Sequence, residues 1–283
     1  MIDSQETHGF VINGGGNQSS YRRAAACAMQ AKLSNPDVNV AIFVTNIRTF
    51  PSKYEECADY LIEFPYGNTA GESVHWNLND WQLFHATPFE KNIVLRSDVL
   101  LLENLQWCWD ALSTYSVCFP QQVKTFRAMP YLPDSRKVWF ENKLANLNDG
   151  MWYFDNSDNS HAYFKMFDVA CHHWREIYKN ILKPEHIPTW PQTDLLHSIT
   201  NSLLDSYQDN LHTNLEVLSY TEMYNFKDNL WTDVLNVWYT GQLKIDNFLQ
   251  SQSFAYINDD FLDEELFNGI RDRYRNSQRK EAA

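Results

Sequence analysis

Residues 8–20 have the sequence HGFVINGGGNQSS, and this stretch decides the fold class. Its first six residues form an apolar run that predicts a buried β-strand, and three consecutive glycines follow at once. Because glycine tolerates positive φ, we expect a tight loop at 14–16. From Ser20 onward, alanines and aromatic residues recur at helical spacing as far as Asn35-Pro36. This pattern predicts a helix that serine side chains cap and that follows the glycine loop directly.

Residues 38–45 predict a second buried strand, which completes a βαβ unit and implies a parallel sheet. The periodicity of the remaining chain predicts further strands at 59–64 and 151–154, helices at 76–86, 161–179 and 193–204, and a closing amphipathic helix at 262–274. The expected fold class is therefore α/β, with a Rossmann-like mixed central sheet flanked by helices in a single domain.

The apolar run at 92–102 contains one charged tripeptide, Arg96-Ser97-Asp98. Either these three residues lie at the carboxyl edge of a strand, where open α/β sheets bind ligands, or they form a loop that imitates a strand. An acid at the end of a central strand can bind Mg²⁺ or Mn²⁺ that bridges a nucleotide diphosphate. Asp98 is therefore a candidate metal ligand, and the alternative interpretation is an ion pair between Asp98 and Arg96.

Composition limits the class of protein. The chain has 283 residues, of which 44% are hydrophobic, and its five cysteines form no CxxC pair, so disorder and a disulfide scaffold are excluded. The N-terminus lacks the apolar segment of a signal peptide, and no run approaches the roughly 18 apolar residues that a membrane span needs. We expect a cytoplasmic protein with reduced thiols and no membrane partner. A net charge of −13 disfavours non-specific nucleic-acid binding, so such binding would need a local basic patch.

Histidine and cysteine residues cluster at 161–186 without the spacing of a known zinc site, because the adjacent His172 and His173 point about 100° apart on a helix. The glycine loop does not match the dinucleotide fingerprint or the P-loop. It is an ordinary tight turn or, at the first βα connection, a place where backbone amides approach a phosphate.

Five segments, in this order, carry a resemblance to a known family: 12–21, 35–46, 88–100, 148–154 and 254–262. The chain resembles the GT-A type of nucleotide-diphosphosugar transferases, and more closely the glycosyltransferases encoded by tailed phages that modify DNA bases. The resemblance implies a GT-A-like fold and an enzyme that transfers a sugar from a nucleotide-diphosphate sugar, with UDP-sugars as the expected donors. Residues 1–110 would form the nucleotide-sugar-binding half and residues 111–283 the acceptor-side half.

The resemblance also implies roles for single residues. The nucleotide base would lie near the side chain of Asn46, and Asp98 would be the last acid of a DxD-like motif that reaches the metal. Asp149 and Gly150 would line the sugar pocket, where the missing side chain of Gly150 leaves room for the donor. Asp194 is the first candidate for the base that deprotonates the acceptor, and Asp149 is the second. The full nucleotide-sugar-binding set comprises Asn13, Gly14, Gly15, Tyr21, Thr45, Asn46, Ser97, Asp98 and Gly150.

Two departures from the family pattern concern the metal. The first acid of the DxD-like tripeptide is here Arg96, and the family's late histidine is here Ala255. Both changes remove groups that bind metal. The hypothesis is that divalent metal, Mn²⁺ or Mg²⁺, is weakly used or dispensable, and that Arg96 neutralises the leaving diphosphate as a third catalytic residue.

The phage relatives suggest an acceptor, the 5-hydroxymethylcytosine of phage DNA, which would receive arabinose or glucose in the cytoplasm of the host cell. The candidate DNA contacts are the basic residues of the irregular segment 116–149, although basic residues are more often part of a solvated surface. One alternative is a transferase that acts on a glycan or small-molecule acceptor, and another is a non-catalytic nucleotide-sugar-binding protein of the same fold. The oligomeric state is left open. The candidate contacts are Lys124, Arg127, Arg136 and Lys137.

Overall fold

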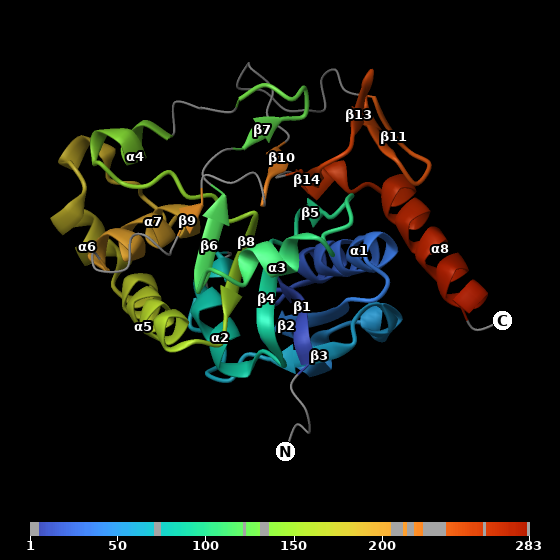
Figure 1. Cartoon of the computed structure of the whole chain (residues 1–283), viewed down its shortest axis with the longest axis horizontal. Helices are drawn as coiled ribbons and strands as arrows, with labels where there is room; N and C mark the ends of the chain where they lie inside the picture. Colours follow the sequence, from blue (N-terminus) through green and yellow to red (C-terminus); the bar gives the residue numbers. More distant parts are fainter. Residues whose placement is uncertain are drawn as a thin grey trace.

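A central seven-stranded sheet organises the molecule (Figure 1). The computed structural model describes residues 6–70, 75–120, 123–130, 136–204, 212–213, 218–222, 236–256 and 259–281. The sheet has the order β3-β2-β1-β4-β8-β6-β9, in which β8 alone runs antiparallel to its neighbours. This arrangement confirms the predicted mixed α/β sheet. Its strands are β1 (Glu6–Asn13), β2 (Asn39–Val44), β3 (Tyr60–Glu63), β4 (Phe89–Leu95), β6 (Val117–Pro120), β8 (Met151–Asp155) and β9 (His212–Thr213).

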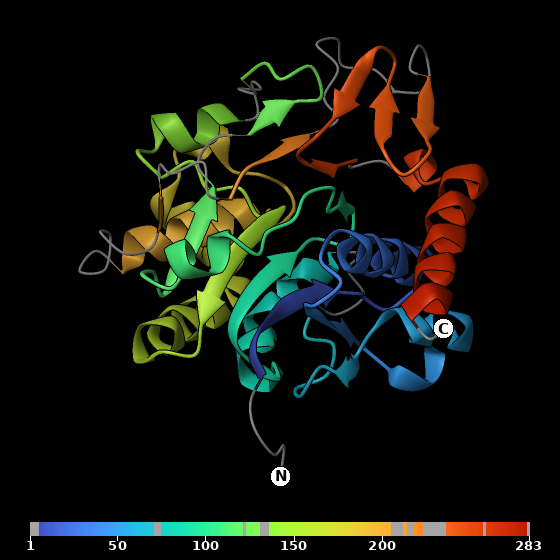
Figure 2. The same cartoon turned by 45° about the vertical axis from the view of Figure 1, so that its right-hand side comes forward.

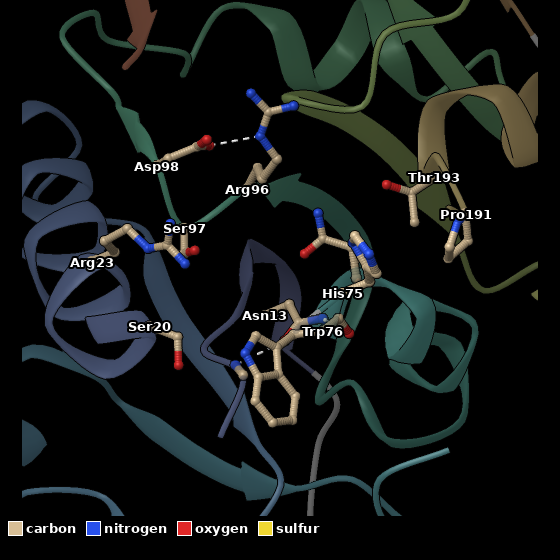
Figure 3. A pocket seen from close by; sticks show the side chains of 12 residues that line it. Asn13, Ser20, Arg23, His75, Trp76, Arg96, Ser97, Asp98, Pro191 and Thr193 are labelled. Atoms are coloured by element: carbon tan, nitrogen blue, oxygen red, sulfur yellow. Dashed lines mark hydrogen bonds and ion pairs between the residues drawn. The ribbon is translucent and has the colours of Figure 1, made fainter. Parts of the chain in front are cut away.

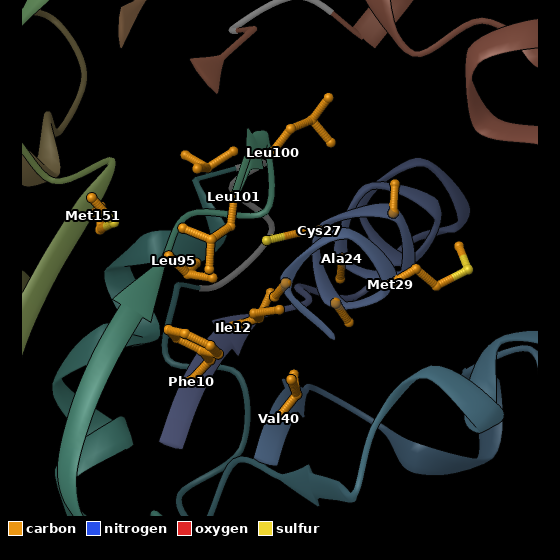
Figure 4. Close-up of a cluster of buried hydrophobic side chains, with 14 of the residues drawn as sticks. Phe10, Ile12, Ala24, Cys27, Met29, Val40, Leu95, Leu100, Leu101 and Met151 are labelled. Carbon is orange, nitrogen blue, oxygen red and sulfur yellow. The ribbon is translucent and has the colours of Figure 1, made fainter. Parts of the chain in front are cut away.

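Both faces of the sheet are buried, because successive side chains of a strand point to opposite faces. In β1, Phe10 and Ile12 belong to one hydrophobic cluster, whereas Val11 between them belongs to another. The first cluster packs beneath α1 (Gln18–Ser34), as Figure 4 shows for side chains of β1 and α1. The second packs beneath α5 (Asp158–His172) and α7 (Thr193–Leu203). The central strands are therefore continuous apolar runs, which is why they were recognisable in the sequence.

Shorter helices and 3₁₀ turns connect these elements, and the long α8 (Glu264–Glu281) packs against α1 (Figure 2). Among the described residues, no helix combines the length and the apolar character needed to cross a membrane. The remaining helical elements are η1 (Ile47–Thr49), η2 (Ser52–Cys57), η3 (Trp76–Gln82), α2 (Leu83–Ala86), α3 (Cys108–Leu112), α4 (Lys137–Glu141), α6 (Trp174–Ile181), η5 (Pro184–His186) and η8 (Asp259–Phe261).

Two small sheets lie on the side of the molecule where β1 and β4 end (Figures 1 and 2). One has the order β5-β14-β10-β7, and the other is an antiparallel β11-β12-β13 sheet. These strands have only two or three residues each, so their position depends on what they pair with. Their bounds are β5 (Val99–Leu100), β7 (Lys124–Thr125), β10 (Tyr220–Glu222), β14 (Ser253–Ala255), β11 (Val237–Tyr239), β12 (Leu243–Ile245) and β13 (Phe248–Gln250).

Three expected helices differ from the prediction in a defined way. The expected 76–86 helix is mostly a 3₁₀ turn, where buried Asn79, Asp80 and Gln82 bond to other groups by their side chains rather than to solvent. The expected 161–179 helix is two helices, α5 and α6, that break at His173. The helix after the glycine loop is capped by Asn17 rather than by serine, and Ser20 completes its capping box.

Candidate functional site

The charged tripeptide lies at the carboxyl edge of β4, which is the first of the two predicted alternatives. The strand ends at Leu95, and the chain turns there, with the amide of Val99 donating to the carbonyl of Arg96 at 2.9 Å. The chain then joins the small sheet as β5. Since β1 and β4 are parallel neighbours, this turn and the glycine loop after β1 meet at one edge.

A cavity of about 160 Å³ opens at this edge (Figure 3). Five of the predicted site residues line it: Asn13, Gly15, Arg96, Ser97 and Asp98. No motif pointed to most of the other lining residues, although Pro191 and Thr193 are neighbours of the predicted Asp194. The lining residues that sequence reasoning missed are Ser20, Arg23, His75, Trp76, Asn77, Pro191 and Thr193.

The glycine loop is held by backbone and amide hydrogen bonds. The amide of Gly14 donates to the Phe43 carbonyl at 2.7 Å, and Gly15 has a φ of +66°, which favours glycine. Asn13 Oδ1 accepts from the amide of Gly15 at 2.9 Å, while Asn13 Nδ2 donates to Asp80 Oδ1 at 2.6 Å. Burial raises the pKa of Asp80 well above its ordinary value. Asn13 therefore acts as an internal brace of the loop.

Arg96 is the centre of a buried ionic cluster. Its Nε donates to Asp98 Oδ1 at 2.6 Å, its Nη1 donates to Asp149 Oδ1 at 2.8 Å, and its Nη2 lies 4.0 Å from Glu222 Oε1. Burial by itself would lower the pKa of Arg96, but the carboxylates of Asp98 and Asp149 outweigh it and raise the pKa well above its ordinary value. Arg96 is therefore a permanent cation. The ion pair with Asp98, expected as an alternative to a metal ligand, is present.

Asp149 and Asp194 have environments that move their pKa values in opposite directions. Burial would raise the pKa of Asp149, but Arg96 and the Thr193 hydroxyl, which donates to Asp149 Oδ2 at 2.6 Å, hold it below its ordinary value. Burial raises the pKa of Asp194, and the nearby Asp149 raises it further, against the opposing effect of Arg136. Two carboxyls with diverging pKa values are the arrangement that separates a permanent anion from a proton acceptor.

Arg136 departs from its expected place in an exposed basic patch. Its side chain is buried, with 8% of the residue exposed, and its Nη2 lies 2.7 Å from Asp194 Oδ2. The same guanidinium donates to the Leu147 carbonyl at 3.0 Å and to Asn148 Oδ1 at 2.8 Å. A buried cation needs ionic and hydrogen-bond partners, and these contacts hold the guanidinium of Arg136 beside the carboxylate of Asp194.

Gly150 also serves a purpose other than the expected one. The space beside its Cα is filled by Tyr220, since a Cβ on Gly150 would lie 2.5 Å from Tyr220 Cζ. The Tyr220 hydroxyl accepts from the amide of Gly150 at 3.2 Å and donates to Glu222 Oε1 at 3.3 Å. The missing side chain therefore makes room for β10 rather than for a ligand, and it links β8 to the small sheet.

The residues around Asp98 do not fit a metal ion. The Asp98 carboxylate already accepts a hydrogen bond from Arg96, and Ala255, which pairs with Val99 in β5, offers no ligand atom in its side chain. Within the described ranges, no three His, Cys, Asp or Glu residues are placed to hold a metal. The positive charge at this position belongs to a guanidinium.

The other predicted residues lie outside the cavity lining. Tyr21 is buried, with its hydroxyl 2.7 Å from Thr49 Oγ1, and Gly14 packs against β2. Thr45 lies beside Gly16, and the exposed Asn46 caps η1 by accepting from the amide of Arg48.

Three of the predicted basic residues do not line the cavity. Lys124 is half-buried in β7, Lys137 is exposed at the start of α4, and Arg127 is exposed. The guanidinium of Arg127 lies 5.1 Å from the ring centre of Phe126. Residues 257–258 of the last resembling segment lie outside the described residues.

Comparison with known proteins gives a likeness in structure alone. No protein-family model matches the chain, and no curated protein sequence matches it. The galactosyltransferase LgtC, in complex with donor and acceptor sugar analogs, aligns with a TM-score of 0.54 and 12% identity over 94% of each chain. An active-site mutant of LgtC aligns with a TM-score of 0.51 and 13% identity over 93% of this chain and 95% of that chain. Mouse xyloside xylosyltransferase 1 aligns with a TM-score of 0.48 and 10% identity over 81% of this chain and 91% of that chain.

A sequence identity of 12–13% makes this a likeness of fold. It extends over nearly the whole chain, from the parallel strands to the elements that follow them. The central sheet, with β8 inserted antiparallel beside β4, agrees with this likeness. The chain therefore has the mixed α/β fold of the GT-A glycosyltransferases.

Proposed function

We propose that the chain is a glycosyltransferase that moves a sugar from a nucleotide-diphosphate sugar, with UDP-sugars as the donor class, to an acceptor hydroxyl. The observation that carries this proposal is the cluster of two arginines and four carboxylates beside the cavity at the carboxyl edge of the sheet. Residues 1–110 would bind the donor, and residues 111–283 would supply the acceptor side.

The arginines and carboxylates of the cluster have charges opposite to those that develop at the two ends of the breaking bond. Transfer leaves negative charge on the diphosphate oxygen and positive charge on the sugar carbon. Arg23 and Arg96 line the cavity and would oppose the first, as fixed cations do for a leaving phosphate. Asp149, whose pKa is held low, would oppose the second as a permanent anion.

Asp194 is the proposed base. In a direct displacement, the acceptor oxygen forms a bond to the anomeric carbon, the bond to the diphosphate breaks, and the acceptor proton passes to Asp194. A base works best when its pKa lies near the working pH, and burial moves the pKa of Asp194 upward, in that direction. Arg136 would hold the carboxylate in place through its contact at 2.7 Å.

Arg96 is proposed to take the place of the divalent cation. Its guanidinium bridges Asp98, in the turn after β4, and Asp149, the carboxylate proposed to face the sugar carbon. Transfer should therefore persist when Mn²⁺ and Mg²⁺ are removed by a chelator. Loss of turnover with chelator, and its recovery with Mn²⁺ by orders of magnitude, would overturn this part of the proposal.

For the acceptor we propose the 5-hydroxymethylcytosine of phage DNA, modified with arabinose or glucose in the host cytoplasm. Support comes from cations that stack on aromatic rings near the small sheets. Arg127 lies over Phe126 and Phe248, and Lys244 lies over Trp238, which is 48% exposed. Aromatic rings among basic residues are the usual means of holding single-stranded or flipped bases.

A glycan acceptor is the second candidate. The net charge of −13 opposes a phosphate backbone, and LgtC, which shares the fold, has been captured with an acceptor sugar analog. A protein that binds nucleotide sugars without transferring them is the third, since the cluster by itself would bind a donor.

The test measures release of nucleoside diphosphate from UDP-, GDP- and ADP-sugars, with and without Mn²⁺. Each donor is offered with hydroxymethylated DNA, with plain DNA and with a mixture of oligosaccharides, and Asp194→Asn is the matched control. Release that depends on hydroxymethylated DNA and disappears in the variant supports the full proposal. Release that depends on oligosaccharides supports the glycan acceptor, and no release above the variant with any donor favours the binding protein.

A further inference from the structure

The indole of Trp76 lines the cavity, but it has no role in the proposed reaction steps. Trp76 begins η3 and lines the cavity, where Figure 3 shows its ring close to Asn13 and Ser20. It is half-buried, so part of the ring is open to the cavity. Within the part of the chain that the structure describes, no second aromatic ring stacks on it.

The backbone of Trp76 is fixed to the end of β1. The side chain of Asn13 donates from Nδ2 to the Trp76 carbonyl at 2.9 Å, and the same amide braces Gly15 and Asp80. One buried side chain therefore ties the glycine loop and the start of η3 together. A ring attached at this point has a defined position before any ligand binds.

The ring itself lies along the glycine loop. A Cβ on Gly15 would come within 2.9 Å of indole Cδ1 and Cγ, and a Cβ on Gly16 would come within 3.0 Å of Cη2. These atoms belong to opposite ends of the indole, so the ring spans both glycines. The indole fills the space that a Cβ on either glycine would need, and Trp76 also lines the cavity.

The surroundings of the ring match a nucleobase. A Cβ on Gly16 would meet both the Thr45 hydroxyl and the indole of Trp76, so the indole lies near the polar group of Thr45 that follows β2. Arg23 and Arg96 line the same cavity. A cavity of about 160 Å³ is smaller than the roughly 300–1,000 Å³ of typical ligand clefts, so a whole nucleotide sugar would extend beyond it.

We propose that Trp76 is the platform on which the nucleobase of the donor stacks, and that it decides how tightly a nucleotide binds compared with its diphosphate alone. This inference rests on the proposed function, because it names the part of the donor that this ring would hold. Stacking of a base on an aromatic side chain tightens binding by about 5- to 150-fold. Phosphate binding by the arginines would be independent of it.

The test compares Trp76→Leu and Trp76→Phe with the wild-type protein by calorimetric titration. The ligands are inorganic pyrophosphate and whichever of UDP, GDP and ADP binds the wild type most tightly. Trp76→Leu should weaken the nucleotide about tenfold and leave pyrophosphate within about twofold, whereas Trp76→Phe should keep nucleotide affinity within about threefold. Trp107→Leu, at a residue 58% exposed and outside the cavity, is the matched control.

Equal losses for nucleotide and pyrophosphate in Trp76→Leu would show that the ring only supports the glycine loop, and they overturn the inference. Unchanged nucleotide affinity in Trp76→Leu overturns it as well. Absence of nucleoside diphosphate binding by the wild type overturns the proposed function and the inference with it.

A fluorescence measurement keeps the test open if Trp76→Leu does not fold. A base stacked on the indole quenches its emission, so the nucleotide should quench the wild type more than Trp76→Phe, and pyrophosphate should quench both equally. Equal quenching of the two proteins by the nucleotide contradicts the proposal.

Discussion

The carboxyl edge of the parallel strands and the small β5-β14-β10-β7 sheet both contribute to the same ionic cluster, but by different means. At the edge, Arg96 and Asp98 follow a seven-residue strand that hydrogen bonds fix on both sides. In the small sheet, Glu222 stands on a three-residue strand that reaches the cluster through Tyr220 and Gly150. The first region supplies its charges from a rigid frame, whereas the second depends on tertiary contacts.

The difference suggests a division of labour. Side chains on a rigid frame keep their geometry without a ligand, which suits groups that oppose charge in a transition state. A short sheet held by a few contacts suits an acceptor side that adapts to its substrate. A variant that perturbs one region, assayed for its effect on the other, shows whether the two regions are coupled.

The largest effect is expected for Asp194→Asn, which removes the proposed base. Transfer should fall about 10²–10⁴-fold with little change in donor binding. In the wild type, the rate should fall as the pH drops, with an acid limb above the ordinary pKa of an aspartate, because burial and Asp149 raise the pKa of Asp194 and only the ionised form accepts a proton. Initial rates across the pH range check this. Asp168→Asn, an acid outside the cluster paired with His172, should behave as wild type.

Arg96→Leu comes next, because it leaves Asp98 and Asp149 without their common cation. Breaking a buried ion pair from one side costs about 3–5 kcal/mol, and we expect the free energy of unfolding in urea to fall by that amount. The exposed Arg127→Leu should change it by less than about 0.5 kcal/mol. A similar small loss for both variants would mean that the cluster contributes nothing to the rigid frame.

Gly150→Ala tests the link between the two regions. Its Cβ would meet the Tyr220 ring, and overpacking of this kind costs about 1–3 kcal/mol of folding stability. Transfer should fall as well, since β10 must move and Glu222 moves with it. The double variant Gly150→Ala/Tyr220→Ala should lose less than the sum of the single variants in a double-mutant cycle. Simple additivity would show that the two regions are not coupled here.

The smallest effect is expected on the acceptor side. If DNA is the acceptor, Arg127→Ala and Lys244→Ala should each reduce the slope of log affinity against log salt concentration by about one. Hydrolysis of the donor in the absence of DNA should stay the same. An unchanged slope in both variants would move the acceptor away from phosphate and toward a neutral glycan.

The parallel half was predictable because its signals are local. A buried strand, three glycines and a helix with an apolar face specify their own structure, and the position of Asp98 at a strand end follows from the apolar run before it. The mixed sheet was therefore foreseeable. Five of the predicted site residues line the cavity, and Asp149, Asp194 and Arg136 belong to the ionic cluster beside it.

The rest depended on contacts between distant segments. Arg136 belongs to an irregular, proline-rich stretch that suggests a solvated surface, and its burial follows from Asp194 in a later helix. Glu222 lies on a strand too short to show an alternation of apolar and polar residues, and Trp76 lies at the start of a 3₁₀ turn. Gly150 was predicted to leave room for the donor, but the ring of Tyr220, on a strand far away in the sequence, fills the space beside its Cα.

The packing of α8 on α1 has a consequence for how the protein is made. The guanidinium of Arg22 in α1 lies 4.9 Å from the ring centre of Phe267, and the Tyr274 hydroxyl donates to the Glu56 carbonyl of η2 at 2.8 Å, so α8 covers both α1 and η2. During translation, α8 is synthesised more than two hundred residues after α1. During that interval the outer surface of α1 has no cover from α8. The helix after the glycine loop is thus synthesised long before the helix that completes its hydrophobic cover.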